Sequence, residues 1–168
     1  MSRYSSQRSA WRSALLCASI AASVAGLLPA AAHAGGPYRY FAITPCRVVD
    51  TRNANGTNGG PALNANTTRS FQIQGLCGVP VGATAVTINV TIVSPNLSTS
   101  GGFATLFPSG GNVPTASTIN FTNSDSALAN GAIVPVSTNT NDLSVFFNPY
   151  NLGSGTVHLV LDLTGYFM

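Results

Sequence analysis

Residues 85–93 read AVTINVTIV, with an apolar side chain at every second position. Successive side chains of a β-strand point to opposite faces, so this alternation predicts a strand with one buried and one solvated face. The buried face is expected to carry Val86, Ile88, Val90 and Ile92. The solvated face is expected to carry Thr87, Asn89 and Thr91, whose side chains suit an exposed sheet surface.

The same alternation returns at residues 156–163, which read TVHLVLDL. The buried face of this second strand is expected to carry Val157, Leu159, Leu161 and Leu163. Other short apolar or alternating runs are separated by clusters of Gly, Pro, Asn and Ser, and none keeps a helical period. The remaining predicted strands are residues 39–43, 47–51, 69–74, 103–107, 117–122, 132–136 and 143–148. The sequence therefore predicts an all-β fold, an antiparallel β-sandwich of the jelly-roll or immunoglobulin-like kind with about eight or nine strands.

The first 34 residues read as a secretory signal peptide. Three arginines precede an apolar run at residues 14–28, and the sequence Ala32-His33-Ala34 supplies a cleavage pattern before Gly35. The run is about 15 residues long, short of the roughly 20 that span a bilayer. We expect an exported protein, extracellular or at the cell surface, or periplasmic in a Gram-negative source. Residues 35–168 are then one domain with no membrane span.

The charged residues exclude some classes of partner. The chain has no Lys and no Glu, and residues 35–168 carry four Arg and four Asp, so the net charge of this part is 4 − 4 = 0. No basic stripe is left after the signal peptide. This argues against binding to nucleic acid or to an anionic membrane surface. The expected partners are a cell-envelope polysaccharide or another surface protein, and the sequence does not predict an oligomeric state.

Two cysteines, Cys46 and Cys77, remain after the signal peptide and are expected to form one structural disulfide. They lack the C-x-x-C spacing of redox and metal sites. The Asn-rich stretch at residues 53–56 has a faint likeness to a calcium loop, but Thr51 and Ala62 would stand where an EF-hand has Asp and Glu. We therefore expect no cofactor and no metal. The long stretch 53–66 is expected to be either a functional loop or a disordered one.

Several motifs resemble a family of modules found in secreted actinobacterial and related bacterial proteins. They read PCRVVDTR at residues 45–52, GVP at 78–80, ATAVTINVT at 83–91, FPSG at 107–110, ANG at 129–131 and HLVLDLTGYF at 158–167. The resemblance covers nearly all of the chain after the signal peptide. It implies a β-sandwich on the outside of a bacterial cell and no established catalysis. Members of the family frequently repeat this unit, whereas here it occurs once.

Two groups of residues are candidates for ligand binding. Asp50 and Arg52 lie two positions apart, so on a strand they share one face, where they either hold a sugar or carboxylate ligand or form a structural ion pair. Asn148, Tyr150 and Asn151 combine an aromatic ring with amides, a composition typical of sugar-binding sites. We expect a non-catalytic surface or binding module, adhesive or glycan-binding.

The alternative is a secreted hydrolase that uses Asp and His side chains on the sandwich surface. His158 and Asp162 share the face of their strand opposite the leucines. Four residues of strand span roughly 13 Å, so this pair does not meet without partners from other strands. His158 is therefore expected to be a structural histidine, and no catalytic residue is assigned.

Overall fold

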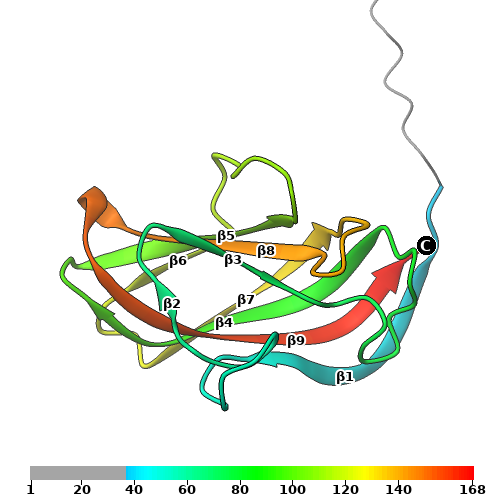
Figure 1. Cartoon of the computed structure of the whole chain (residues 1–168), viewed down its shortest axis with the longest axis horizontal. Helices are drawn as coiled ribbons and strands as arrows, with labels where there is room; N and C mark the ends of the chain where they lie inside the picture. Colours follow the sequence, from blue (N-terminus) through cyan, green and yellow to red (C-terminus); the bar gives the residue numbers. More distant parts are fainter. Residues whose placement is uncertain (1–36) are drawn as a thin grey trace, which may run out of the picture. The chain divides into compact units, whose positions relative to one another are not determined.

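Nine strands in two antiparallel sheets make up the part of the chain that the computed structural model describes, residues 37–168 (Figure 1). The first sheet has the order β1-β9-β4-β7, with β2 also paired to β9, and the second has the order β3-β8-β5-β6. The strands of the first sheet are β1 (Tyr40–Asp50), β2 (Leu63–Asn64), β4 (Ala85–Leu97), β7 (Ala127–Pro135) and β9 (Gly155–Phe167). Those of the second are β3 (Thr67–Phe71), β5 (Gly101–Pro108), β6 (Ile119–Thr122) and β8 (Leu143–Pro149). The predicted all-β sandwich is confirmed.

Most strand ends lie within about four residues of the sequence-based expectation, and three differences are larger or concern whole strands. Residues 39–43 and 47–51 were expected to form two strands, but residues 40–50 form the single strand β1, which pairs with β9 across two register shifts. The short strand β2 was not expected. Strand β7 begins five residues before the expected start at 132, because residues 127–131 already pair with β4.

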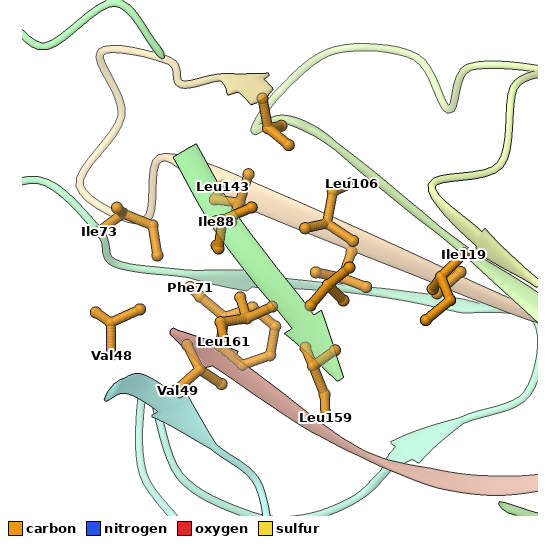
Figure 2. Packing of buried hydrophobic residues seen from close by; sticks show 14 of the residues in the cluster. Val48, Val49, Phe71, Ile73, Ile88, Leu106, Ile119, Leu143, Leu159 and Leu161 are labelled. Carbon is orange, nitrogen blue, oxygen red and sulfur yellow. The ribbon is translucent and has the colours of Figure 1, made fainter. Parts of the chain in front are cut away.

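The hydrophobic core lies between the sheets, where both inner faces contribute side chains (Figure 2). All eight side chains expected to be buried from the alternation in the two diagnostic segments are buried. The second sheet supplies the large rings of Phe71, Phe121 and Phe147. Because the inner faces are apolar and the outer ones are mostly polar, the two sheets can pack in only one sense.

One side of the sandwich, formed by the edges of β1 and β3, is covered by residues 51–62; we call it the closed flank. Asn58 bridges the two sheets there. Its Nδ2 donates to the carbonyl oxygens of Val48 at 3.0 Å and Gln72 at 2.7 Å, and its Oδ1 accepts from the Gln72 backbone N–H at 3.1 Å. The long stretch expected to be either functional or disordered is an ordered structural cover.

Arg69 of β3 holds the same loop from the other sheet. Its guanidinium donates to the backbone carbonyl oxygens of five loop residues, at distances of 2.6 to 3.4 Å: Gly56, Thr57, Gly59, Gly60 and Pro61. Burial lowers the pKa of the guanidinium. The loop also needs glycine, because a Cβ at Gly59 would overlap the carbonyl oxygen of Ala54.

The disulfide between Cys46 and Cys77 is present, with a Cα–Cα distance of 5.8 Å, as expected. It ties the segment between β3 and β4 to strand β1. The opposite side of the sandwich, formed by the edges of β7 and β6, has no such cover within the described residues; we call it the open flank. There the Asn130 side chain donates to the carbonyl oxygen of Thr118 at 2.7 Å.

The predicted signal peptide and the cleavage point between Ala34 and Gly35 lie outside the described residues. Within residues 37–168, no helix has the length and apolar character needed to cross a membrane.

Candidate functional site

Asp50 and Arg52, a candidate pair for ligand binding, bind each other. Nε and Nη2 of Arg52 donate to the two carboxylate oxygens of Asp50 at 2.8 and 2.6 Å, and the Arg52 backbone N–H donates to the same carboxylate at 3.1 Å. The Asp50 side chain is only 8% exposed. Because these bonds occupy the carboxylate, the pair acts as a strand-end clamp in this structure.

A second ion pair extends this cluster across the outer face of the first sheet. Nε and Nη2 of Arg47 donate to the two carboxylate oxygens of Asp162 at 2.8 and 3.1 Å. Nη1 of Arg47 also lies 3.6 Å from the Asp50 carboxylate. The four charges therefore alternate in sign from Arg52 to Asp162, joining β1 to β9.

The charge pattern shifts the pKa values in the direction that an ion cluster requires. The side-chain hydrogen bonds from Arg52 lower the pKa of Asp50 to about 2 from 3.8, although burial acts in the opposite direction. The hydrogen bond to Asp162 raises the pKa of Arg47. With its pKa lowered in this way, Asp50 stays ionised at neutral pH and is not poised to donate a proton.

His158 and Asp162, the pair weighed for a hydrolase, face different partners. His158 pairs with Val93 of β4 and Asp162 with Asn89, so they lie at separate levels of the sheet. The His158 Nδ1 is 3.2 Å from both the Oγ1 and the carbonyl oxygen of Thr51. The structure thus places the histidine against the residue that follows β1.

Asn148, Tyr150 and Asn151, the predicted sugar-binding group, lie at the end of the sandwich away from the C-terminus (Figure 1). Tyr150 begins a 3-10 turn and is partly exposed to solvent. Asn148 does not point freely to solvent, because its Nδ2 donates to Oδ1 of Asn66 at 2.8 Å. The three residues are near one another in sequence, and none of them lines the pocket described next.

A pocket that the sequence did not indicate opens at the opposite end, where β4 begins and β7 ends. We call it the end pocket. Its volume is about 540 Å³, within the range of small-ligand sites. Most of its walls come from two segments, residues 72–84 and residues 136–142. The lining residues are Gln72, Gln74, Val81, Gly82, Ala83, Thr84, Val136, Ser137, Thr138, Asn139, Thr140 and Asp142.

Hydrogen bonds hold the two walls of the end pocket in place. Gln74 accepts from the Gly82 backbone N–H at 2.6 Å and donates to the Ser137 carbonyl oxygen at 2.7 Å, so one side chain connects both segments. Asp142 is fully buried at the base and accepts from the backbone N–H groups of Ile73 and Gln74 at 3.0 and 2.7 Å. Burial raises the pKa of Asp142, and these hydrogen bonds oppose that shift.

The end pocket therefore presents neutral polar groups to a ligand, since the oxygens of its one carboxylate are taken by the backbone. Within residues 37–168 no group of three or more His, Cys, Asp or Glu side chains is arranged to hold a metal ion. Sequence reasoning missed the pocket because its walls are two separate loops, and only the run of polar residues at 137–141 hinted at an exposed, hydrogen-bonding segment. Comparison with known proteins found no matching family model, no matching curated protein and no matching solved structure.

Proposed function

We propose that the protein is an exported, non-catalytic module of the cell surface that binds a neutral polysaccharide in the end pocket. The observation that carries this proposal is the pocket itself. It is large enough for a sugar unit, its walls are fixed by hydrogen bonds, and its accessible polar groups are amides and hydroxyls. Such groups match sugar hydroxyls, which both donate and accept hydrogen bonds.

The use of the carboxylates supports a binding role over catalysis. Asp50 and Asp162 are held by arginines, and Asp142 by backbone N–H groups. Asp125 accepts from the backbone N–H and Oγ1 of Thr122 at 2.7 and 2.9 Å, which lowers its pKa. A glycoside hydrolase needs two converging carboxyl groups, one of them protonated. Here each carboxylate has a structural partner instead.

The Cys46–Cys77 disulfide supports export, because such bonds form and persist in oxidising compartments. The predicted signal peptide agrees with it, and so does the resemblance of residues 45–52 and 158–167 to modules of secreted bacterial proteins. A module without a basic surface is also suited to uncharged polymers, since it gains nothing from steering by phosphate or sulfate groups.

A co-sedimentation assay with insoluble glycans tests this proposal. The full chain would be expressed with its own N-terminal segment in a secreting bacterial host, recovered from the medium, and mixed with insoluble neutral polysaccharides, with purified peptidoglycan as a charged comparison. We expect saturable binding to at least one of the neutral polysaccharides. Thr140→Arg places a long side chain at the pocket, where Thr140 makes no hydrogen bond of its own, and should weaken binding at least about tenfold.

Two matched variants make the result specific. Thr115→Arg adds the same charge at an exposed site outside the pocket and should bind like the native protein. Tyr150→Ala removes the aromatic ring at the other end and should also leave binding unchanged. If Tyr150→Ala abolishes binding while Thr140→Arg does not, the ligand binds at the Tyr150 end of the sandwich and not in the end pocket. If no polysaccharide is bound, the glycan proposal fails.

A further inference from the structure

Strand β7 forms an open edge of the first sheet along its whole length. It pairs with β4 over nine consecutive residues without a bulge, from Ala127 to Pro135. None of these residues is charged, and the outer-face side chains are small except for Ile133, which is 65% exposed. A long, regular, uncharged edge strand is a template for pairing with another strand.

The direction of the backbone groups follows from the ends of the ladder. The Val136 N–H donates to the carbonyl oxygen of Thr84, and the Ser94 N–H donates to the carbonyl oxygen of Ser126, both at 3.1 Å. The backbone N–H and C=O groups of the even-numbered residues of β7 therefore face β4. In an antiparallel ladder the residues between them point their N–H and C=O groups away from the partner. These residues are Ala127, Ala129, Gly131 and Ile133, and all four are exposed. Within the described chain, no backbone group from another element bonds to them.

The other edges of the two sheets are protected. Strand β1 contains Pro45 and two register shifts, and the closed-flank loop bonds to it through Asn58. Strand β3 is five residues long and carries Arg69 at its centre, and β6 has four residues. Short strands, charges, prolines and bulges are the usual devices that prevent edge pairing. Strand β7 has none of them before Pro135.

We infer that β7 is the contact surface for a second copy of this chain, with the two β7 strands antiparallel about a twofold axis at Asn130. In this register Ala129 of one copy pairs with Gly131 of the other, and Ala127 pairs with Ile133. Every outward N–H and C=O group of the four residues then finds a partner, which maximises the backbone bonds. The two first sheets become one continuous sheet across the interface.

Self-pairing fits the chemistry of this edge better than pairing with a charged or bulky strand. The outward groups lie symmetrically about Asn130, which is the arrangement that a twofold contact requires. Two copies bring no like charges together within the paired strands, because residues 127–135 are uncharged. The exposed Ile133 side chain is placed beside Ala127 of the second copy, where the small methyl group leaves room for it.

The mass of the exported protein in solution, measured by sedimentation over a range of concentrations, tests this inference. The native protein should show a reversible increase to twice the monomer mass. Ala129→Pro removes one outward N–H without removing any bond to β4, and edge strands tolerate proline at such positions. We expect this variant to remain monomeric. Ala129→Ser keeps the N–H at the same position and should dimerise like the native protein.

Amide hydrogen exchange of the native protein provides a second readout that does not depend on any variant folding. The N–H groups of Ala129, Gly131 and Ile133 should exchange slowly at concentrations where the dimer forms and quickly after dilution. A protein that stays monomeric at millimolar concentration overturns the inference. So does a dimer whose three amides exchange quickly, or one that persists in folded Ala129→Pro, because its contact then lies elsewhere.

Discussion

The two flanks of the sandwich solve the problem of exposed sheet edges in opposite ways. On the closed flank, Asn58 and Arg69 bind backbone carbonyls from both sheets and from the loop between them. On the open flank, the Asn130 side chain makes a single bond to the carbonyl oxygen of Thr118, just before β6, and the outward backbone groups of β7 have no partner within the described residues. The stretch 53–66, expected to be either functional or disordered, is therefore ordered and held by hydrogen bonds, whereas β7 keeps an unpaired edge within the described residues.

The difference follows from where each side can obtain hydrogen bonds. The edges of β1 and β3 are covered by residues 51–62, a loop without apolar pattern whose many backbone carbonyls must be satisfied. Arg69 alone donates to five of these carbonyl oxygens. β7 faces no such loop, so its outward groups are satisfied by water in the monomer. Substitutions that remove interactions from the closed flank should therefore destabilise the protein much more than substitutions on the open flank.

The largest effect is expected from removing the disulfide of the closed flank with Cys46→Ser and Cys77→Ser together. The bond closes a loop with a sequence separation of 31, and the loss of that constraint on the unfolded chain is worth about 3 to 4 kcal/mol. Denaturant titration of the oxidised native protein and the double variant measures the difference. Reduced native protein should match the variant, and a difference under about 1 kcal/mol would contradict a stapling role for this bond.

The next largest effect comes from a matched pair of asparagines. Asn58→Ala removes three hydrogen bonds and leaves partners from both sheets unpaired, which should cost about 2 to 3 kcal/mol. Asn130→Ala removes one exposed bond on the open flank and should cost less than about 1 kcal/mol. Urea unfolding of both variants measures the gap. Equal costs would show that the two flanks are equally well held.

The sequence predicted the strands but not the flanks. Alternation identified the inner faces of β4 and β9 because burial on one side imposes a period of two on any sheet. It also suggested the disulfide from two cysteines. Residues 53–66 were undecided, because an ordered loop and a disordered one share the same Gly, Asn and Thr composition. The hydrogen bonds that Arg69 and Asn58 make in the folded chain distinguish them.

The candidate site was less predictable for the same reason. Asp50 and Arg52 were expected to share a face, and their alternatives were ligand binding and an ion pair; the structure places them in a bidentate pair. The end pocket joins Gln74 to residues far along the chain, and no local pattern encodes that meeting. The predicted strand began only at residue 132, yet the regular ladder with β4 already includes Asn130 and Gly131.

The Asp50 clamp on the closed flank makes stability depend on acid. Its pKa is about 2 when folded and 3.8 ordinarily, so its contribution is complete above about pH 4 and is lost as the pH falls toward 2. The contribution is about 1 to 2 kcal/mol, because Arg52 is half exposed. Unfolding of Asp50→Asn at pH 7 and pH 2.5 measures it. The native protein should have the larger free energy of unfolding at pH 7 and lose most of this difference at pH 2.5. A difference that does not change with pH would show that the ion pair does not stabilise the fold.

The smallest effect is expected from Gly131→Ala at the centre of the open flank. A Cβ there meets no atom within 4 Å, and the residue has no positive φ, so the methyl group fits without strain. Alanine also restricts the unfolded chain more than glycine does, which should stabilise the protein by about 0.4 to 1 kcal/mol. Thermal unfolding against the native protein at equal concentration measures the change. A loss of stability would mean that another group packs against Gly131 on the outer face of β7, and that this flank is not open.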